Sequence, residues 1–403
     1  MIPFSPPRID PKIVDEVSKA LTSGWITTGP RTKKFENKIA NYCGVPKVLC
    51  VSSATAGMEL ILRHMGIGPG DEVIIPAYTY CATANVVCHT GATPVMIDAN
   101  EHDFNINTDL IKKAITSRTK AIIAVDFAGL PCDYDEINDL VQDPEVKQLF
   151  SANNEKQEKL GRIMVMSDAA HSMGGIYYGT TVGSLCDVSV FSFHAVKNLT
   201  TAEGGAICLN FPSEFDVDQI YKELNTLSLH GQSKDAFAKS QKGAWEYDVL
   251  EPGYKCNMTD ILASIGLVEI DRYDEDLNKR KEIFDQYAQQ LGKHDWAIIP
   301  PYETDVKISS YHVFALRIKE VSLAQRNEII QKIFDQEVSV NVHFKPLPLL
   351  TAYKKRGFDI GNYPIANSLF ESEISLPVYF DLSREQVSQV VEAVKSSVKS
   401  VIG

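Results

Sequence analysis

The sequence of 403 residues lacks the features that mark a membrane-bound or secreted protein. No window approaches the ~18 to 20 apolar residues of a membrane-spanning helix. The N-terminus, MIPFSPPRIDP, carries prolines and charge where a signal peptide has an apolar core. We therefore expect a soluble, cytoplasmic protein without a membrane partner.

Positive charge is also in short supply. The chain has 40 lysines and arginines against 52 acidic residues, and its formal net charge is −12. Such a chain is repelled as a whole by nucleic acids and by anionic membranes. We therefore expect no nucleic-acid partner, although the composition allows a local basic pocket for a phosphate group.

Paired cysteines and metal-binding motifs are missing as well. Eight cysteines occur, none in CxxC spacing, and most lie inside apolar runs, where cysteine behaves as a small hydrophobic residue. We expect them to be reduced thiols in the core of a cytoplasmic protein. His171 follows Asp168 by three residues, but neither an HExxH motif nor a cysteine–histidine cluster accompanies this pair. No metal is therefore expected.

What the sequence does contain is an alternation of short apolar runs with helical patterns, from about residue 45 to residue 210. Strands that are apolar on both faces are typical of a sheet covered by helices on both sides. The alternation itself indicates an α/β domain with a largely parallel sheet. Seven runs are predicted as strands: 48–51, 72–75, 94–97, 121–125, 163–166, 188–191 and 206–209.

The length of the chain favours two domains, because it exceeds what one simple core needs. We predict an N-terminal arm at residues 1–30, a large domain at 31–258 and a small C-terminal domain at 259–403. Two polar stretches of the large domain stand out. Residues 142–161 are interpreted as a surface excursion, and residues 213–250 as polar helix and loop.

The small domain shows both helical and strand patterns. A long helix is predicted at Thr259–Leu291, strands at His312–Ile318 and Val338–Val342, and a closing helix at Ser383–Ser400. An α+β arrangement follows from this order of elements.

Lys197 lies in the stretch SFHAVKNLTTAEGG, residues 192–205, which connects the last two predicted strands. A lysine in this position is either a surface charge or a residue aimed into a site at a strand end. Ligand sites in α/β sheets form at the carboxyl ends of strands. Asp168 ends the predicted strand 163–166, which precedes the strand that leads to Lys197. The two charged groups are therefore expected at one rim of the sheet.

A possible phosphate site follows the first predicted strand. In Ser52-Ser-Ala-Thr-Ala-Gly57, small residues precede a helix predicted at Ala56–Met65, and exposed backbone N–H groups at such a helix start suit a phosphate. The alternative is an ordinary N-cap. Three such groups together are typical of a pyridoxal phosphate enzyme. They are a lysine that forms a Schiff base and acts as general base, a carboxylate that faces a pyridinium nitrogen, and an anchor for the phosphate.

Five separated motifs carry a resemblance to a known family: SGWITTGP, VSSATAGM, SDAAHSMGG, SFHAVKNLTTAEGG and EPGYKCNMTD. In this order, from about residue 3 to 395, the sequence resembles the DegT/DnrJ/EryC1/StrS group of pyridoxal phosphate-dependent sugar aminotransferases. The resemblance implies fold type I, the aspartate aminotransferase-like architecture, with a mostly parallel seven-stranded sheet in the large domain and a smaller α+β C-terminal domain. It also implies a homodimer whose active sites lie at the subunit interface.

The resemblance implies roles for individual residues as well. Lys197 would bind the cofactor covalently, Asp168 would pair with its pyridine nitrogen and His171 would lie beside it, and these three are the expected catalytic residues. Further cofactor contacts are expected from Ala54, Thr55 and Ser192 at the phosphate, Tyr80 at the ring face, and Asn257, reaching the phosphate of the partner subunit's site. The residues expected near the substrate are Thr28, His194, His343 and Lys345.

The reaction implied by the resemblance is transfer of an amino group from glutamate to a nucleotide-linked keto-sugar, which leaves 2-oxoglutarate. We expect a UDP-linked 4-keto-sugar as the acceptor. A 3-keto-sugar aminotransferase that acts on a dTDP- or GDP-linked sugar is one alternative, and a pyridoxal phosphate-binding regulator without turnover is another. Sugar 3-dehydratases of the same family replace the lysine by histidine, so Lys197 argues against that reaction.

Overall fold

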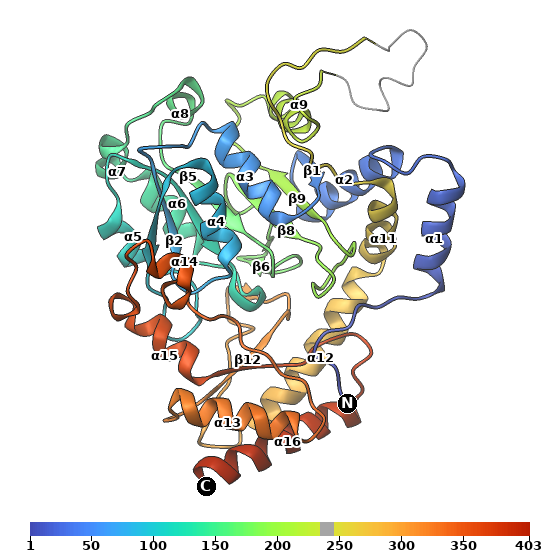
Figure 1. Ribbon diagram of the computed structural model, residues 1–403, viewed down its shortest axis with the longest axis vertical. Coiled ribbons are helices and arrows are strands. Elements are labelled where there is room, and N and C mark those ends of the chain that lie inside the picture. Colours follow the sequence, from blue (N-terminus) through green and yellow to red (C-terminus); the bar gives the residue numbers. More distant parts are fainter. Residues whose placement is uncertain (234–245) are drawn as a thin grey trace.

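A seven-stranded sheet forms the centre of the computed structural model, which describes residues 1–233 and 246–403 (Figure 1). The strand order is β1-β9-β8-β5-β4-β2-β3. Neighbours from β8 to β3 run parallel, whereas β9 runs antiparallel to both β8 and β1. All seven predicted runs form strands of this sheet, which confirms the mostly parallel α/β fold. The strands are β1 (Lys47–Val51), β2 (Glu72–Pro76), β3 (Thr93–Ile97), β4 (Thr119–Val125), β5 (Met164–Asp168), β8 (Val188–Ser192) and β9 (Gly205–Leu209).

Alternate residues of each strand enter different cores, which explains why the strands are apolar on both faces. In β1, Leu49 and Val51 join the cluster that contains residues of α3, α4 and α9. Val48 and Cys50 join the cluster that contains residues of α2 and α11. Helices therefore cover both faces of the sheet, as the sequence predicted. These helices are α2 (Pro30–Cys43), α3 (Ala54–His64), α4 (Cys81–Thr90), α9 (Val217–Leu227) and α11 (Asp260–Asp271).

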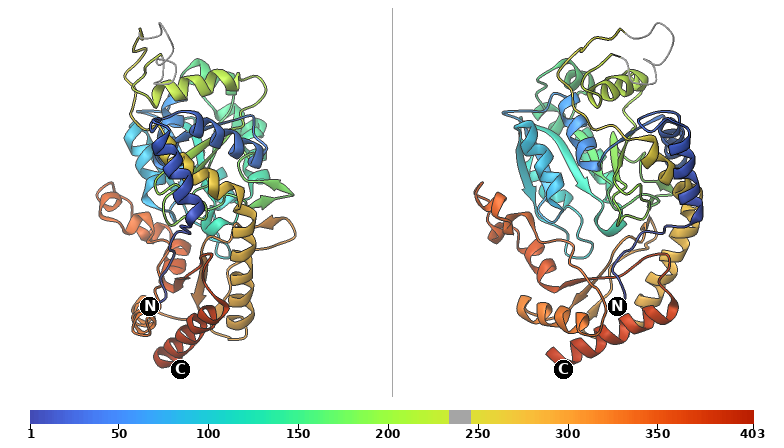
Figure 2. Two further views of the ribbon diagram at one scale, coloured as in Figure 1. Left: turned by 90° about the vertical axis from the view of Figure 1, so that its right-hand side faces the viewer. Right: turned by 45° about the vertical axis from the view of Figure 1, so that its right-hand side comes forward.

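The C-terminal elements lie below the large sheet (Figure 2). They surround a separate hydrophobic cluster. Its centre is a three-stranded antiparallel sheet in the order β10-β12-β13. Ile2 belongs to the same cluster, so the N-terminal arm reaches down to these elements. The domain boundaries predicted above stay a prediction. The elements are α12 (Tyr273–Leu291), β10 (Ala297–Ile298), β12 (Phe314–Ile318), α13 (Leu323–Phe334), β13 (Glu373–Leu376) and α16 (Arg384–Ile402).

Two predictions for the C-terminal region were wrong in detail. Val338–Val342 is not a strand. It makes only isolated bridges, from Val338 to Ile2 and from Asn341 to Ser375 of β13, and the N–H of His343, which would continue the second pairing, donates to the side chain of Glu373 instead. The third strand is β13, which the sequence did not reveal. The helix predicted at Thr259–Leu291 is divided into α11 and α12 at Arg272, whose guanidinium pairs with carboxylates of Asp10 and Glu269.

Other elements lie at the periphery. The polar stretch 142–161 contains α7 and α8, two short helices, and α9 lies within the stretch 213–250, of which residues 234–245 fall outside the described part.

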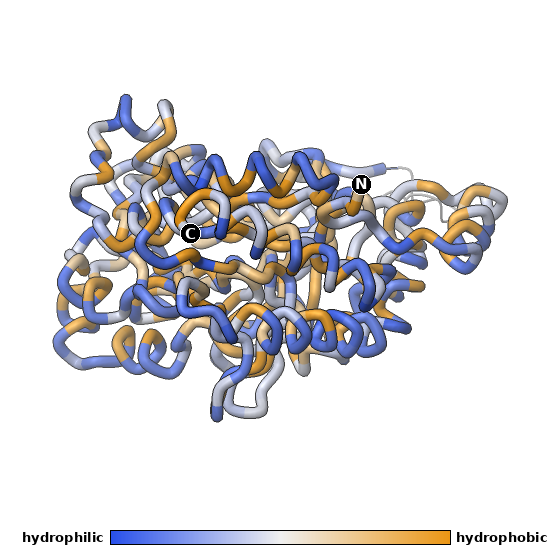
Figure 3. Tube along the Cα trace, turned by 90° about the horizontal axis from the view of Figure 1, so that it is seen from below, coloured by the Kyte–Doolittle hydropathy of each residue, from blue (hydrophilic) through white to orange (hydrophobic). Residues whose placement is uncertain are grey.

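Among the helices of the described residues, none is both long and apolar enough to cross a membrane. Hydrophilic and hydrophobic residues alternate along the helices, as expected where one face packs on a core (Figure 3). The remaining elements are α1 (Pro11–Thr22), α5 (Thr108–Ala114), α6 (Tyr134–Gln142), α7 (Pro144–Leu149), α8 (Glu155–Leu160), β6 (Ile176–Tyr177), β7 (Thr180–Thr181), β11 (Lys307–Ile308), α14 (Thr351–Lys354), α15 (Pro364–Ser372), and the short 3-10 segments η1 (Phe127–Gly129), η2 (Leu347–Leu349) and η3 (Ile360–Asn362).

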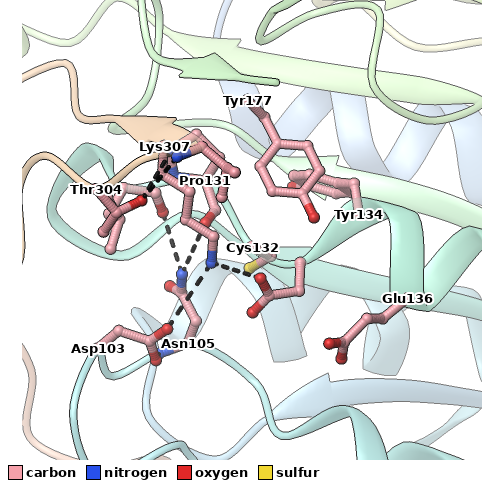
Figure 4. A network of polar contacts seen from close by, with 12 residues as sticks. Asp103, Asn105, Pro131, Cys132, Tyr134, Glu136, Tyr177, Thr304 and Lys307 are labelled. Atoms are coloured by element: carbon pink, nitrogen blue, oxygen red, sulfur yellow. Dashed lines mark hydrogen bonds and ion pairs between the residues drawn. The ribbon is translucent and has the colours of Figure 1, made fainter. Parts of the chain in front are cut away.

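A polar network ties β11 to the loops below the large sheet (Figure 4). The ammonium of Lys307 lies 2.8 Å from a carboxylate oxygen of Asp133 and 3.9 Å from one of Asp103. The amide of Asn105 donates hydrogen bonds of 3.2 Å to the carbonyls of Leu130 and Pro131. Because Lys307 is buried, the opposite charges beside it are needed to offset its loss of hydration. The network holds the C-terminal region against the loops that follow β3 and β4.

Candidate active site

A cavity of about 320 Å³ opens at the carboxyl ends of the parallel strands. It lies between the start of α3, the ends of β4, β5 and β8, and the segment that contains His343 and Phe344. This position is the one that sequence reasoning predicted for a site in an α/β sheet. Of the expected site residues, nine line the cavity: Ala54, Thr55, Tyr80, Asp168, His171, Ser192, His194, Lys197 and His343.

Asp168 is the last residue of β5 and is only 5% exposed. Its carboxylate accepts a hydrogen bond of 2.8 Å from the hydroxyl of Thr83 and one of 3.3 Å from the backbone N–H of Ala170. Burial raises the pKa of Asp168, while these hydrogen bonds and the nearby charge of Lys197 act in the opposite direction. A buried carboxylate of this kind is best satisfied by a bound cationic group.

Lys197 lies in the turn between β8 and β9, where its backbone N–H donates to the carbonyl of His194 at 2.9 Å. The side chain is half-buried and lines the same cavity as Asp168. Among the described residues, none forms a hydrogen bond or ion pair with its amine. Burial lowers the pKa of Lys197 to about 8, although the carboxylate of Asp168 acts to raise it. The amine is therefore far more reactive near neutral pH than that of a surface lysine.

The start of α3 forms a notch suited to an anion. Ser53 caps the helix by accepting a hydrogen bond of 3.1 Å from the N–H of Ala56, whereas the N–H groups of Ala54 and Thr55 precede the first intrahelical acceptors. Gly205, at the start of β9, passes so close that a Cβ atom on it would lie 2.5 Å from the nitrogen of Ala54. The absence of that Cβ keeps the helix start accessible beside Ser192, which ends β8 and lines the cavity.

His171 contributes a buried ring to the wall of the cavity. Its ring lies 5.6 Å from that of Phe344 in a stacked arrangement and 4.4 Å from that of His312. Burial lowers the pKa of His171 well below its ordinary value, so the ring is neutral. The Nδ1 atom is buried and has no hydrogen-bond partner among the described residues. Such an atom calls for a partner, which a molecule bound in the cavity would provide.

Aromatic and imidazole rings form the outer part of the cavity. Tyr80 precedes α4 with 61% of its surface exposed, and its ring lies 5.9 Å from that of Phe344. His194 is exposed, with Nε2 3.8 Å from a carboxylate oxygen of Glu203. His343 faces the cavity from the C-terminal region, and burial together with Lys197 lowers its pKa to about 3.

Three expected site residues do not line this cavity in the same chain. The amide of Asn257 donates a hydrogen bond of 2.6 Å to the hydroxyl of Thr28, which in turn donates to the carbonyl of Met258. Lys345 is exposed and is absent from the cavity wall. Thr28 and Asn257 therefore form a polar group of their own, away from Lys197.

Two residues of the site escaped sequence reasoning. Thr83 donates a hydrogen bond to Asp168 and so orients its carboxylate. The sequence feature that could have pointed to Thr83 is its position in the first turn of α4, three residues after Tyr80. Phe344 packs against both Tyr80 and His171. The sequence feature that could have pointed to Phe344 is its position directly after His343. Neither signal was specific, because threonine in a helix and phenylalanine beside a histidine are both common in ordinary cores.

The cavity fits pyridoxal phosphate in each of its parts. The buried carboxylate of Asp168 suits the ring nitrogen, the amine of Lys197 suits the aldehyde, and the notch at Ala54 suits the phosphate. The unpartnered Nδ1 of His171 leaves a further polar contact to be made. The fold and this site together define the class of pyridoxal phosphate-dependent enzymes of fold type I.

The chain belongs to the DegT/DnrJ/EryC1/StrS aminotransferase family, whose model matches residues 7–395. Among curated relatives, the spore coat polysaccharide biosynthesis protein SpsC of Bacillus subtilis is 36% identical over 402 residues, which cover 99% of this chain and 97% of that protein. An uncharacterised protein of Methanocaldococcus jannaschii is 38% identical over 399 residues and covers 98% of this chain and 97% of its own length.

Solved structures agree with this assignment. A Streptococcus pneumoniae protein assigned as a sugar aminotransferase, in its PMP form, is 48% identical, covers all of both chains and superposes with a TM-score of 0.96. The same protein was also solved in a PLP form, with a TM-score of 0.95. The aminotransferase PseC of Helicobacter pylori, involved in the biosynthesis of pseudoaminic acid, is 26% identical, covers 99% of each chain and has a TM-score of 0.85. The chain is thus a sugar aminotransferase of a pyridoxal phosphate-dependent family.

Proposed function

We propose that this enzyme transfers an amino group from glutamate to a nucleotide-linked keto-sugar, with a UDP-linked 4-keto-sugar as the acceptor. The observation that carries the proposal is the meeting of Lys197, Asp168 and the start of α3 in one cavity. Loss of hydration in this cavity destabilises the charged forms of both the lysine and the aspartate. A purely structural role would not explain why two such groups are buried together.

The roles of the chain's own residues follow from their surroundings. When bound, pyridoxal phosphate supplies an electron-withdrawing ring that stabilises negative charge on the substrate carbon. Asp168 keeps the ring nitrogen protonated, because a cation beside its buried carboxylate offsets the cost of burial. Lys197 holds the aldehyde and then accepts and returns a proton at Nζ, for which a pKa of about 8 is well suited near neutral pH.

His171 and Tyr80 orient the ring in this proposal. The neutral His171 offers its unpartnered Nδ1 to a polar group at the ring edge, and it is held there by Phe344 and His312. Tyr80 covers one ring face. The N–H groups of Ala54 and Thr55, with the hydroxyl of Ser192, bind the phosphate.

The sugar half of the substrate is assigned from the outer part of the cavity. His194, His343 and Lys345 offer hydrogen-bond donors toward a hydroxyl-rich, anionic ligand, and the first two line the cavity. The names of the relatives support a sugar substrate, since they include a polysaccharide biosynthesis protein and an enzyme of pseudoaminic acid biosynthesis. The cytoplasmic location expected from the sequence stays a prediction.

We also propose that the working unit is a homodimer with shared sites. Asn257 and Thr28 lie outside the cavity of their own chain and are hydrogen-bonded to each other. In a dimer, Asn257 reaches the phosphate in the partner subunit's site, and Thr28 lies beside the substrate there.

A panel of 4-keto- and 3-keto-sugars linked to UDP, dTDP or GDP tests this function. Glutamate alone is expected to change the absorbance of the bound cofactor, and a UDP-linked 4-keto-sugar to restore it. Lys197→Ala is expected to abolish turnover, whereas Lys113→Ala, on the exposed face of α5, should not. Turnover only with 3-keto-sugars would replace the proposed acceptor, and an unchanged spectrum with glutamate would favour a regulator without turnover.

A further inference from the structure

A chain of hydrogen bonds connects a buried carboxyl group to a histidine of the cavity wall. Glu373, the first residue of β13, is fully buried. One of its oxygens contacts the hydroxyl of Ser375, and the other accepts a hydrogen bond of 3.0 Å from the backbone N–H of His343. The hydroxyl of Ser375 lies 2.9 Å from Nδ1 of His343. Glu373, Ser375 and His343 therefore form one continuous relay.

The relay leaves only one ring nitrogen of His343 available to the cavity. Nδ1 is committed to Ser375, and no described residue forms a hydrogen bond with Nε2. Since the ring lines the cavity, Nε2 is the atom that a bound molecule meets. Whether Nε2 donates or accepts a hydrogen bond depends on which nitrogen carries the proton.

The hydroxyl of Ser375 has a single proton, so the hydrogen bonds of the relay must all point in one direction. If Glu373 is ionised, Ser375 donates to it, Nδ1 of His343 donates to Ser375, and Nε2 is an acceptor. If Glu373 is protonated, it donates to Ser375, Ser375 donates to Nδ1, and Nε2 carries the proton. The second oxygen of Glu373 accepts the N–H of His343 in both states.

We propose that Glu373 is a positioning residue that sets the tautomer of His343 through Ser375, so that a protonated Glu373 makes Nε2 a hydrogen-bond donor to an oxygen of the sugar substrate. The part of the inference that names the sugar rests on the proposed function. The part that concerns the tautomer rests on the relay alone.

Burial favours the protonated form of Glu373, against the effect of the charges around it. Burial raises the pKa of Glu373 to about 8, against the lowering effects of Ser375, the N–H of His343 and the guanidinium of Arg326. Arg326, from α13, donates to the backbone carbonyl of Glu373 at 3.2 Å. Arg317 faces Glu373 in the register of β12 and β13. The guanidinium of Arg326 therefore weakens the effect of burial without cancelling it.

The groups around His343 keep its ring neutral. Burial and the charge of Lys197 lower the pKa of His343 to about 3. The ring of His171, also neutral, lies 6.1 Å away, and the hydroxyl of Tyr78 donates to the carbonyl of His343 at 2.7 Å. From pH 6 to pH 10 the ring thus exchanges tautomers without becoming charged.

Two substitutions separate the relay from ordinary packing. In Glu373→Gln the amide oxygen must accept the N–H of His343, so the NH₂ group faces Ser375 and the relay is locked with the proton on Nε2. In Ser375→Ala the connection is broken while the backbone contact of Glu373 is kept. Glu371→Gln is the matched control, since Glu371 lies two residues away and accepts from the amide of Asn367.

The tautomer is read from ¹⁵N chemical shifts of His343 in the cofactor-loaded, full-length enzyme, from pH 6.5 to pH 9.5. We expect the proton on Nε2 at low pH and on Nδ1 at high pH, with a midpoint near 8. In Glu373→Gln the proton stays on Nε2 throughout, and Glu371→Gln behaves as the unaltered enzyme does. A tautomer that does not change with pH, or that still changes in Glu373→Gln, would overturn the proposal.

Kinetics then tests the link to the substrate. In the unaltered enzyme, kcat/KM for the keto-sugar is expected to fall about fivefold between pH 8 and pH 9 relative to Glu373→Gln, because with a midpoint near 8 the donor form of His343 falls from about one half to about one eleventh of the molecules. Equal pH profiles with an intact tautomer switch would reject the contact with substrate. Absence of any reaction with keto-sugars would reject the proposed function, while the tautomer measurement would still decide the relay.

Discussion

Asp168 and Lys197 share one cavity, and burial disfavours the charged form of each. It raises the pKa of the carboxyl group and lowers that of the amine, and each group moderates the shift of the other. A cofactor with a cationic ring nitrogen and an aldehyde satisfies both residues at once. In the proposed cofactor site, these two groups therefore pair poorly until the cofactor binds.

The amine of Lys197 is expected to titrate near pH 8 in the chain without cofactor. At pH 7 about a tenth of it is then unprotonated, whereas an ordinary lysine with a pKa near 10.5 has about one molecule in three thousand in this form. Reductive ¹³C-methylation followed by NMR measures this pKa directly. In Asp168→Asn the pKa should fall further, because the carboxylate raises it. A value near 10 in the unaltered chain would contradict the buried setting of Lys197.

Thr83→Val is expected to weaken cofactor binding. The substitution keeps the shape of the side chain and removes the hydrogen bond of 2.8 Å to Asp168. A hydrogen bond to a charged group contributes about 1.5 to 3 kcal/mol, which corresponds to a loss of affinity of about ten- to a hundredfold. Absorbance titration of the apo chain with pyridoxal phosphate provides the measurement.

Thr90→Val is the control for this substitution. Thr90 lies on the same helix, α4, and its hydroxyl donates to the carbonyl of Val87 at 2.8 Å. It should leave cofactor affinity nearly unchanged. Equal losses in the two variants would mean that Thr83 acts through the stability of α4 and not through Asp168.

At the scale of elements, the site depends on how closely β9 passes the start of α3. β9 runs antiparallel to both of its neighbours in the large sheet, β1 and β8, and its first residue, Gly205, faces Ser192 of β8. The backbone of β9 at Gly205 therefore lies against the N–H groups of Ala54 and Thr55. A strand that begins with glycine leaves room at this point for an anion.

Gly205→Ala is expected to reduce the affinity for the cofactor phosphate and the stability of the chain. The added Cβ would lie 2.5 Å from the nitrogen of Ala54 and from the carbonyl carbon of Ser53, both backbone atoms that yield little. Overpacking of this kind costs about 1 to 3 kcal/mol. Urea unfolding gives the stability, and titration with pyridoxal against pyridoxal phosphate isolates the phosphate contribution.

The control for the glycine is Gly68→Ala, in the turn before β2. A Cβ there would meet only the carbonyl of Thr90 at 3.5 Å, an ordinary contact. This variant should bind pyridoxal phosphate normally. If Gly205→Ala weakened pyridoxal and pyridoxal phosphate alike, the notch at α3 would not be the phosphate site.

At the scale of the whole molecule, the arm and the C-terminal region close the site from below. Ile2 enters the C-terminal core, and the ring of Phe4 stacks on that of His343 at 5.8 Å. The hydroxyl of Ser5 donates to the carbonyl of Val196, next to Lys197. Segments separated by more than 300 residues in the sequence thus meet around one cavity.

Mixed dimers test whether sites are shared between subunits. A dimer of one Lys197→Ala chain and one Asn257→Asp chain is expected to have one intact site, because the second chain supplies Lys197 and the first supplies Asn257. Activity should rise on mixing toward about half the activity per site of the unaltered enzyme. A mixture of Lys197→Ala with Asp168→Asn should stay inactive, since each of its sites carries one defect. No recovery in mixed dimers verified by mass spectrometry would place Asn257 outside the partner's site.

Much of the fold was predictable because it depends on neighbours in the sequence. The seven apolar runs became the seven strands of the large sheet, and Ser383 was correctly placed as the start of the last helix, where it is the N-cap of α16. Predictions failed where distant segments compete. Val338–Val342 has the composition of a strand, yet the side chain of Glu373 accepts the N–H of His343 that would continue its pairing with β13.

The class of the protein can be read from the motifs around Lys197, Asp168 and the start of α3. The side chains that shift the pKa values of these groups become apparent only in the folded chain. Thr83 bonds to Asp168 across 85 positions, and the close approach of Gly205 to Ala54 spans a longer stretch still. The physical reason is that periodicity and capping act between residues a few positions apart, whereas burial, pKa and hydrogen-bond direction depend on contacts that exist only once the chain has folded.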